Sequence, residues 1–77
     1  MQIKFLAFGQ VATITGNSFE LNESVADTDS LKSVLHYQYP ALNEIKYALA
    51  VDKKLVNENM ELNENVTVAL LPPFSGG

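Results

Sequence analysis

Val66-Thr67-Val68-Ala69-Leu70-Leu71 is the clearest β-strand pattern in this chain of 77 residues, because β-branched and aliphatic side chains fill it almost completely. Residues 1–8, at the other end of the chain, form a second apolar run. Ile3, Phe5 and Ala7 lie on one face of that run by period-two alternation, and the opposite face is also largely apolar. Apolar residues on both faces indicate a central strand of a sheet.

One amphipathic helix is predicted in the middle of the chain. Residues 27–30 read Asp-Thr-Asp-Ser, a cluster of residues that cap helix N-termini. Pro40 ends the helix, because proline disfavours helical dihedral angles in the residue before it. His36, the one histidine of the chain, lies off the apolar stripe, and we expect it to be a solvated helix-face residue. That stripe consists of Leu31, Val34, Leu35 and Tyr39.

The remaining segments predict short strands joined by turns. In chain order they are a helical turn or loop at residues 11–15, a strand at 18–22, a strand at 47–51, a tight polar turn at 52–54 and a short return strand at 55–56. Residues 57–65 are rich in acid and amide side chains. They predict a loop in which Met60 and Leu62 are held to the core.

This order of elements predicts an α+β fold, with one main helix packed on one face of a mixed sheet. The ubiquitin-like β-grasp has the same order, and its first and last strands pair in parallel at the centre of the sheet. Residues 1–71 then form one β-grasp domain, and residues 72–77 form an extended C-terminal tail. A chain of this length is one small domain of modest stability.

The composition excludes several classes of function. Nine acidic residues stand against five basic ones, all lysine, which argues against a nucleic-acid partner. The acidic surface suits either a basic protein partner or plain solubility. Absence of cysteine excludes disulfides and thiolate metal sites and fits a reducing compartment. The apolar runs are too short for a membrane span, and no signal-peptide pattern opens the chain, so we expect a cytoplasmic protein with no membrane partner.

Groups for acid–base or nucleophilic catalysis are scarce. The serines have no nucleophile-elbow setting, and the carboxylate pair Glu61 and Glu64 lies in a loop of the solvated type. Gly76-Gly77 is not a phosphate cradle, because no helix follows it. We therefore expect no catalytic residue, no metal and no cofactor bound by this chain.

Each part of the tail has a physical rationale. Pro72-Pro73 fixes two φ angles near −65° and favours an extended path. The residues beyond the last strand then reach up to about 20 Å from the sheet. Phe74 is suited to anchor in a partner's pocket. Ser75-Gly76-Gly77 has almost no side-chain bulk, so it can thread a narrow channel. The terminal carboxylate is sterically unhindered, so it can attack a phosphoryl centre.

At these residues the chain resembles the small-subunit family of molybdopterin synthase. Residues 70–77 follow the ending of that family, which is two apolar residues, Pro-Pro, a variable residue, a small residue and Gly-Gly. The run from Ile3 to Val11 and the helix opening at residues 30–35 are also similar to that family. The resemblance covers essentially the whole chain, although the chain departs from the family in lacking arginine and in its Glu/Asn-rich stretch before the last strand.

The resemblance implies a sulfur carrier, a non-catalytic, sulfur-donating subunit of a heterotetrameric sulfurtransferase complex. An E1-like enzyme would adenylate the Gly77 carboxylate with ATP, and sulfur delivery would give a C-terminal thiocarboxylate. The large synthase subunit would take in the tail, and the sulfur would pass to a pterin precursor. Gly76 would give slender access. Pro72, Pro73, Phe74 and Ser75 would thread, dock and aim the tail.

The resemblance also implies an apolar docking surface that includes Leu71, Leu6 and Phe8. An ordinary core position is the alternative for Leu6 and Phe8, and the sequence slightly favours it. Three other functions stay open: a related carrier for thiamine synthesis or tRNA thiolation, a ubiquitin-like protein modifier, and a plain β-grasp interaction module. The arm formed by residues 72–75 favours molybdopterin synthesis among the carriers.

Overall fold

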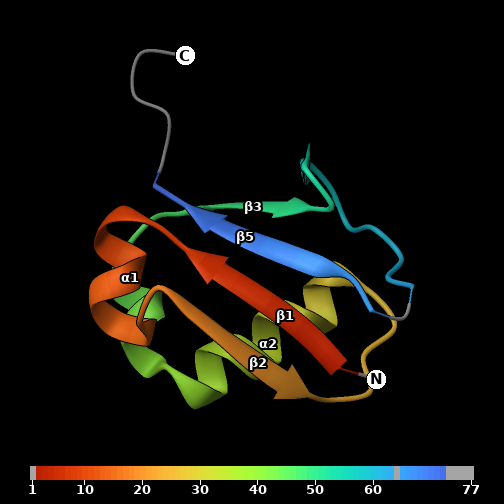
Figure 1. Cartoon of the computed structure of the whole chain (residues 1–77), viewed down its shortest axis with the longest axis horizontal. Coiled ribbons are helices and arrows are strands. Elements are labelled where there is room, and N and C mark those ends of the chain that lie inside the picture. The colour runs from red at the N-terminus through yellow and green to blue at the C-terminus, as the bar shows by residue number, and fades with distance from the viewer. Residues whose placement is uncertain (1, 64, 73–77) are drawn as a thin grey trace.

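The computed structural model describes residues 2–63 and 65–72. Among these residues, five strands form one mixed sheet in the order β2-β1-β5-β3-β4 (Figure 1). The first and last strands pair in parallel at its centre, and the other neighbours are antiparallel. The strands are β1 (Gln2–Ala7), β2 (Ser18–Asn22), β3 (Ala48–Val51), β4 (Lys54–Leu55) and β5 (Thr67–Leu71). The predicted ubiquitin-like β-grasp is therefore confirmed.

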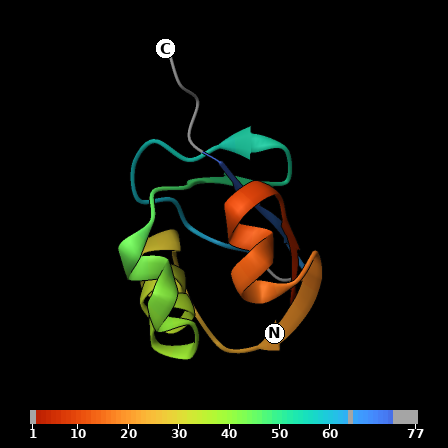
Figure 2. The ribbon, with the colours of Figure 1, turned by 90° about the vertical axis from the view of Figure 1, so that its left-hand side faces the viewer.

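The main helix, α2 (Thr28–Gln38), covers one face of this sheet (Figures 1 and 2). A shorter helix, α1 (Gly9–Thr15), follows β1, so the helical alternative for residues 11–15 is the correct one. A 3₁₀ helix, η1 (Pro40–Glu44), follows α2 and was not predicted. None of the described helices has the length and apolarity needed to cross a membrane.

The core lies between α2 and the sheet. The parallel register of β1 and β5 sets Phe5 beside Val68 and Ala7 beside Leu70. The inward side chains of these strands are buried together with those of α2. Phe5 also stacks on Phe19 of β2, with ring centroids 4.6 Å apart. The opposite sheet face carries no helix among the described residues (Figures 1 and 2).

The N-terminus of α2 is fixed by its cap and by the loop before β5. Asp27 caps the helix, because its carboxylate accepts a hydrogen bond of 2.9 Å from the N–H of Ser30. Hydrogen bonds from Ser30 and Asn59 lower the pKa of the Asp27 carboxyl below its ordinary value. Asn59 accepts from the N–H of Asp29 at 2.9 Å, and the buried hydroxyl of Thr28 accepts from the N–H of Met60 at 3.0 Å. These contacts confirm the predicted cap and the attachment of the loop to the core.

A two-residue turn joins β3 to β4 and is fastened to β5. Asp52 and Lys53 have φ angles of +48° and +73°, as in the mirror-image turns that suit the twist of a hairpin. The N–H of Thr67 donates to the Asp52 carboxylate at 3.0 Å, and the N–H of Asp52 donates to the Thr67 carbonyl at 2.8 Å. The predicted turn is confirmed. The return strand is shifted by one residue and ends at Leu55.

Candidate functional site

The tail begins at the end of the central strand β5. The N–H of Phe8 donates to the carbonyl of Leu70 at 3.0 Å, one residue beyond the end of β1. Pro72, the first residue of the predicted tail, is exposed. β1 and β3 flank β5, so the start of the tail is held by the central strand of the sheet. The roles predicted for the rest of the tail concern residues outside the described part of the chain, namely Pro73, Phe74, Ser75, Gly76 and Gly77.

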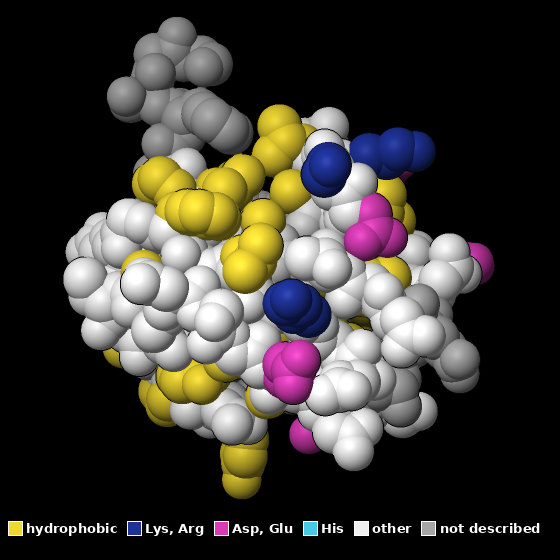
Figure 3. Space-filling model, viewed as in Figure 1, with side chains coloured by type: hydrophobic (Ala, Val, Ile, Leu, Met, Phe, Trp, Pro, Cys, Tyr) yellow, Lys and Arg dark blue, Asp and Glu magenta, His cyan; other side chains and the backbone are white. Residues whose placement is uncertain are grey.

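The sheet face opposite α2 carries an apolar surface next to the start of the tail. Figure 3 shows hydrophobic side chains gathered on the upper part of this face. Alternation along the strands turns these side chains away from α2, and the strand registers set them in two adjoining rows. We call this surface the tail-root patch. Its residues are Leu6, Ala69, Ala50 and Leu55 in one row and Leu71 and Ala48 in the next, which Phe8 continues one residue beyond the end of β1.

The outer members of the patch are accessible to a partner. The side chains of Phe8 and Leu55 are 47% and 49% exposed, and Leu6 and Leu71 are half-buried. Neither Leu6 nor Phe8 belongs to the core cluster. The ordinary-core alternative for these two residues is therefore wrong. One apolar face of β1 packs in the core with α2, and the other belongs to the outward tail-root patch.

A shallow hollow lies in the patch beside the β3–β4 turn. It has a volume of about 300 Å³ and is lined by Leu6, Asp52, Lys53, Thr67 and Ala69. Small side chains at Ala50 and Ala69 lie between the larger Leu6 and Leu55 in the row across the strands, so they leave room for an apolar side chain of a partner. Lys53 places a positive charge at its border. The alanines at alternate positions of β3, Ala48 and Ala50, are the one sequence signal that could have indicated this hollow.

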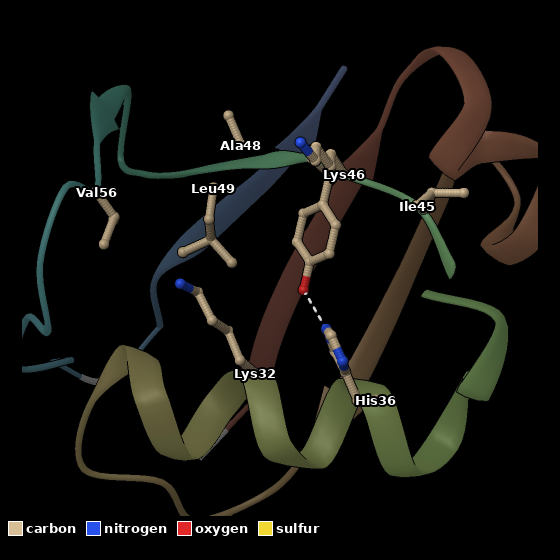
Figure 4. A pocket seen from close by; sticks show the side chains of 8 residues that line it. Lys32, His36, Ile45, Lys46, Ala48, Leu49 and Val56 are labelled. Carbon is tan, nitrogen blue, oxygen red and sulfur yellow. Dashed lines mark hydrogen bonds between the residues drawn. The ribbon is translucent and has the colours of Figure 1, made fainter. Parts of the chain in front are cut away.

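His36 lies in a second, separate groove between α2 and β3 (Figure 4). Its Nδ1 is 2.6 Å from Oδ1 of Asn43, and its Nε2 is 2.6 Å from the hydroxyl of Tyr47. The Asn43 amide donates to the Pro40 carbonyl, which orients its oxygen toward the ring. The neutral imidazole therefore carries its proton on Nδ1 and accepts from Tyr47. The expectation of a solvated His36 is wrong, because the ring is half-buried and both nitrogens are engaged.

This groove offers little for catalysis. Its volume is about 490 Å³, and Lys32 and Lys46 stand on its walls. Burial raises the pKa of the Tyr47 hydroxyl, which keeps this group protonated and able to donate to His36. Among residues 2–63 and 65–72, no three His, Asp or Glu side chains come together as a metal site would require. The described residues thus point to the tail and the patch at its root.

Residues 5–77 match the sequence model of the ThiS family, and this match includes the tail. The chain belongs to the ThiS family. A curated relative from Caenorhabditis briggsae, named molybdopterin synthase sulfur carrier subunit, is 35% identical and is covered over 99% of its length by the whole of this chain. The ThiS-family membership and this relative together bear out the resemblance that residues 70–77 carry.

Several solved structures are similar in shape to this ThiS-family chain. A chain in the complex of subunits 1 and 2 of molybdopterin-converting factor from Helicobacter pylori is similar, with 26% identity, full coverage of both chains and a TM-score of 0.70. A putative molybdopterin converting factor subunit 1 from Pyrococcus furiosus reaches a TM-score of 0.85 at 17% identity, over 96% of this chain and 99% of its own. SAMP1 from Haloferax volcanii reaches 0.79 at 17% identity, with full coverage of both chains. The last two support the fold alone.

Proposed function

We propose that this chain is the sulfur-carrier subunit of a molybdopterin synthase and that its Gly77 carboxylate carries the sulfur. The observation that carries the proposal is the position of the tail, which starts on the central strand β5 beside the exposed tail-root patch. The name of the C. briggsae relative supports the pathway, and the ThiS-family match extends through Gly77.

The proposed chemistry uses no acid or base from this chain. An E1-like enzyme binds ATP, and an oxygen of the Gly77 carboxylate attacks the α-phosphorus, which releases pyrophosphate and leaves an acyl-adenylate. Hydrosulfide supplied by the sulfur donor then attacks the acyl carbon and displaces AMP, so the carboxylate becomes a thiocarboxylate. In the synthase this sulfur passes to the pterin precursor, and water restores the lost oxygen. The chain contributes a terminal carbonyl that two enzymes can reach in turn.

The tail-root patch is the proposed docking surface for the large subunit. The similar H. pylori protein forms a complex of subunits 1 and 2, which supports a partner of this kind. Phe8 is a large aromatic residue that is half exposed at the edge of the patch, the setting in which interface anchors are found. Docking there would leave the tail free to enter the partner, because Pro72 adjoins the same edge of the patch.

Intact mass spectrometry after incubation with the activating enzyme, ATP and a sulfur donor tests the proposal. Replacement of one oxygen atom by sulfur at the C-terminus is the expected result, and a variant without Gly77 should show no such change while keeping the circular dichroism of the intact fold. Covalent adducts with lysines of other proteins would instead identify a protein modifier. Molybdopterin formation by the truncated variant would overturn the carrier proposal.

A further inference from the structure

Gly9 and Pro72 lie against each other where the tail begins. A Cβ atom on Gly9 would lie 3.3 Å from Cγ of Pro72, 3.4 Å from its Cβ and 3.7 Å from its Cδ. The shortest of these distances is below the optimum of roughly 3.5–4.0 Å for two carbon atoms. A side chain at position 9 would therefore crowd the proline ring, which would have to shift by a few tenths of an ångström. Gly9 also has a φ angle of +59°, a region that favours glycine.

The register of the central strands explains why the two residues meet. The N–H groups of Lys4 and Phe8 donate to the carbonyls of Val66 and Leu70, which is the regular parallel pattern. The next donor in this pattern would be the N–H of residue 72, directed at the Phe8 carbonyl. Proline has no N–H, so the hydrogen-bonded ladder stops there. At this point the Pro72 ring lies against Gly9 instead.

We propose that Gly9 is a positioning residue for the sulfur-carrying tail: its missing side chain seats Pro72 and sets the direction in which the tail leaves the sheet. This inference rests on the proposed function. Gly77 is the fifth residue after Pro72, a reach of at most about 17 Å, so a displaced Pro72 shifts the start of the whole arm. The transferred sulfur must meet its target in a defined geometry, and small misplacements slow such reactions strongly.

Gly16 provides a matched control at the other end of the same helix. It follows the last residue of α1, has a φ angle of +88°, and a Cβ atom there would meet nothing within 4 Å. Gly9→Ala and Gly16→Ala therefore both place alanine in a strained backbone region, but only the first presses on Pro72. Comparison of the two variants separates loss of stability from displacement of the tail.

Single-turnover sulfur transfer tests the inference. Wild type, Gly9→Ala, Gly16→Ala, Pro72→Gly and the double variant Gly9→Ala/Pro72→Gly would be prepared with a synthetic C-terminal thiocarboxylate, so that no result depends on the activating enzyme. Transfer to the pterin precursor is then timed with saturating large subunit. We expect Gly9→Ala to slow transfer about tenfold or more relative to Gly16→Ala. Gly16→Ala should cost at least as much thermal stability, because a φ of +88° with a ψ of 169° is essentially restricted to glycine. In the Pro72→Gly background, Gly9→Ala should have no further effect, because the ring that it displaces is gone.

Equal transfer rates for the two alanine variants would overturn the inference. An undiminished effect of Gly9→Ala in the Pro72→Gly background would overturn it as well. Nuclear Overhauser contacts between the α protons of Gly9 and the ring protons of Pro72 are expected in the wild type, and their absence would remove its structural basis. Failure of the wild-type thiocarboxylate to transfer sulfur would instead overturn the proposed function, and the role of Gly9 with it, even where the proton contacts are present.

Discussion

The hydroxyl of Tyr47 lies 2.6 Å from Nε2 of His36, and this contact joins the residue before β3 to the last turn of α2. The two rings are tilted toward each other, with centroids 5.8 Å apart. Asn43 of η1 contacts the other nitrogen of the imidazole, so the His36 side chain links α2, η1 and the start of β3. In this carrier, His36 therefore has a structural task.

Tyr47→Phe should lower the free energy of unfolding by about 1 kcal/mol, because it removes one partly buried hydrogen bond and keeps the ring. Urea unfolding measures the loss. Tyr37→Phe is the matched control, since Tyr37 is 88% exposed and the same change there should have no measurable effect. The folded-state pKa of Tyr47 is raised, so its contribution is complete below the ordinary value of 10.0 and is lost as pH rises through the raised pKa. A loss that is equal for both variants would contradict the assignment.

Asp27→Ala should lower Tm by roughly 4–8 °C at neutral pH, because the N–H of Ser30 loses its cap. The pKa of Asp27 is lowered in the folded state, so this stabilisation is present above the ordinary value of 3.8 and is lost as pH falls through the lowered pKa. Thermal unfolding followed by circular dichroism should show the two proteins converging in acid. Asp27→Asn keeps a hydrogen-bond acceptor, so its Tm should fall less. A Tm difference between wild type and Asp27→Ala that does not depend on pH would rule out the ionised cap.

Lys53→Gly should raise the free energy of unfolding by about 1 kcal/mol, because Lys53 has a φ angle of +73° and glycine adopts this region without steric cost. The control is Lys54→Gly, which removes the same charge and side chain from the next residue, in β4. That change should lower stability by about 0.5–1 kcal/mol, because glycine weakens strands. Chemical unfolding should show changes of opposite sign in the free energy of unfolding of the two variants. Changes of the same sign would argue against strain in the turn.

Phe8→Ala should weaken binding of the large subunit by about 2 kcal/mol, or roughly thirtyfold, if Phe8 is an anchor of the docking surface. Titration calorimetry with the purified partner measures the change. Tyr37→Ala removes an exposed aromatic side chain from α2, on the other side of the sheet, and should leave the affinity unchanged. Unaltered affinity of the Phe8 variant would place the docking surface elsewhere.

Local patterns predicted the elements well. The strand at residues 18–22 and the helix capped by Asp27 appear as predicted, because alternation, capping and the proline stop act over a few neighbouring residues. The 3₁₀ helix after Pro40 was missed, since Pro40 signals the end of α2 without specifying the conformation of the next residues.

Contacts between distant residues could not be predicted in the same way. His36 meets Tyr47 across eleven residues, and Gly9 meets Pro72 through the pairing of the first and last strands. Periodicity showed that both faces of β1 are apolar, but it gives no information on whether a helix or a partner protein covers each face. The sheet order decides this question, and it leaves Leu6 and Phe8 on the face opposite α2.

The central position of β5 has a consequence for biosynthesis. This strand is the last of the five in chain order, yet it lies between β1 and β3, so neither of them has its final neighbour until residues 67–71 have been made. Such long-range pairing must follow translation. A product that stops before Thr67 therefore lacks the middle of the sheet and should be degraded as an unfolded chain. Every such product also lacks the tail, so its degradation removes chains that can never carry sulfur before they can compete for the partner's docking site.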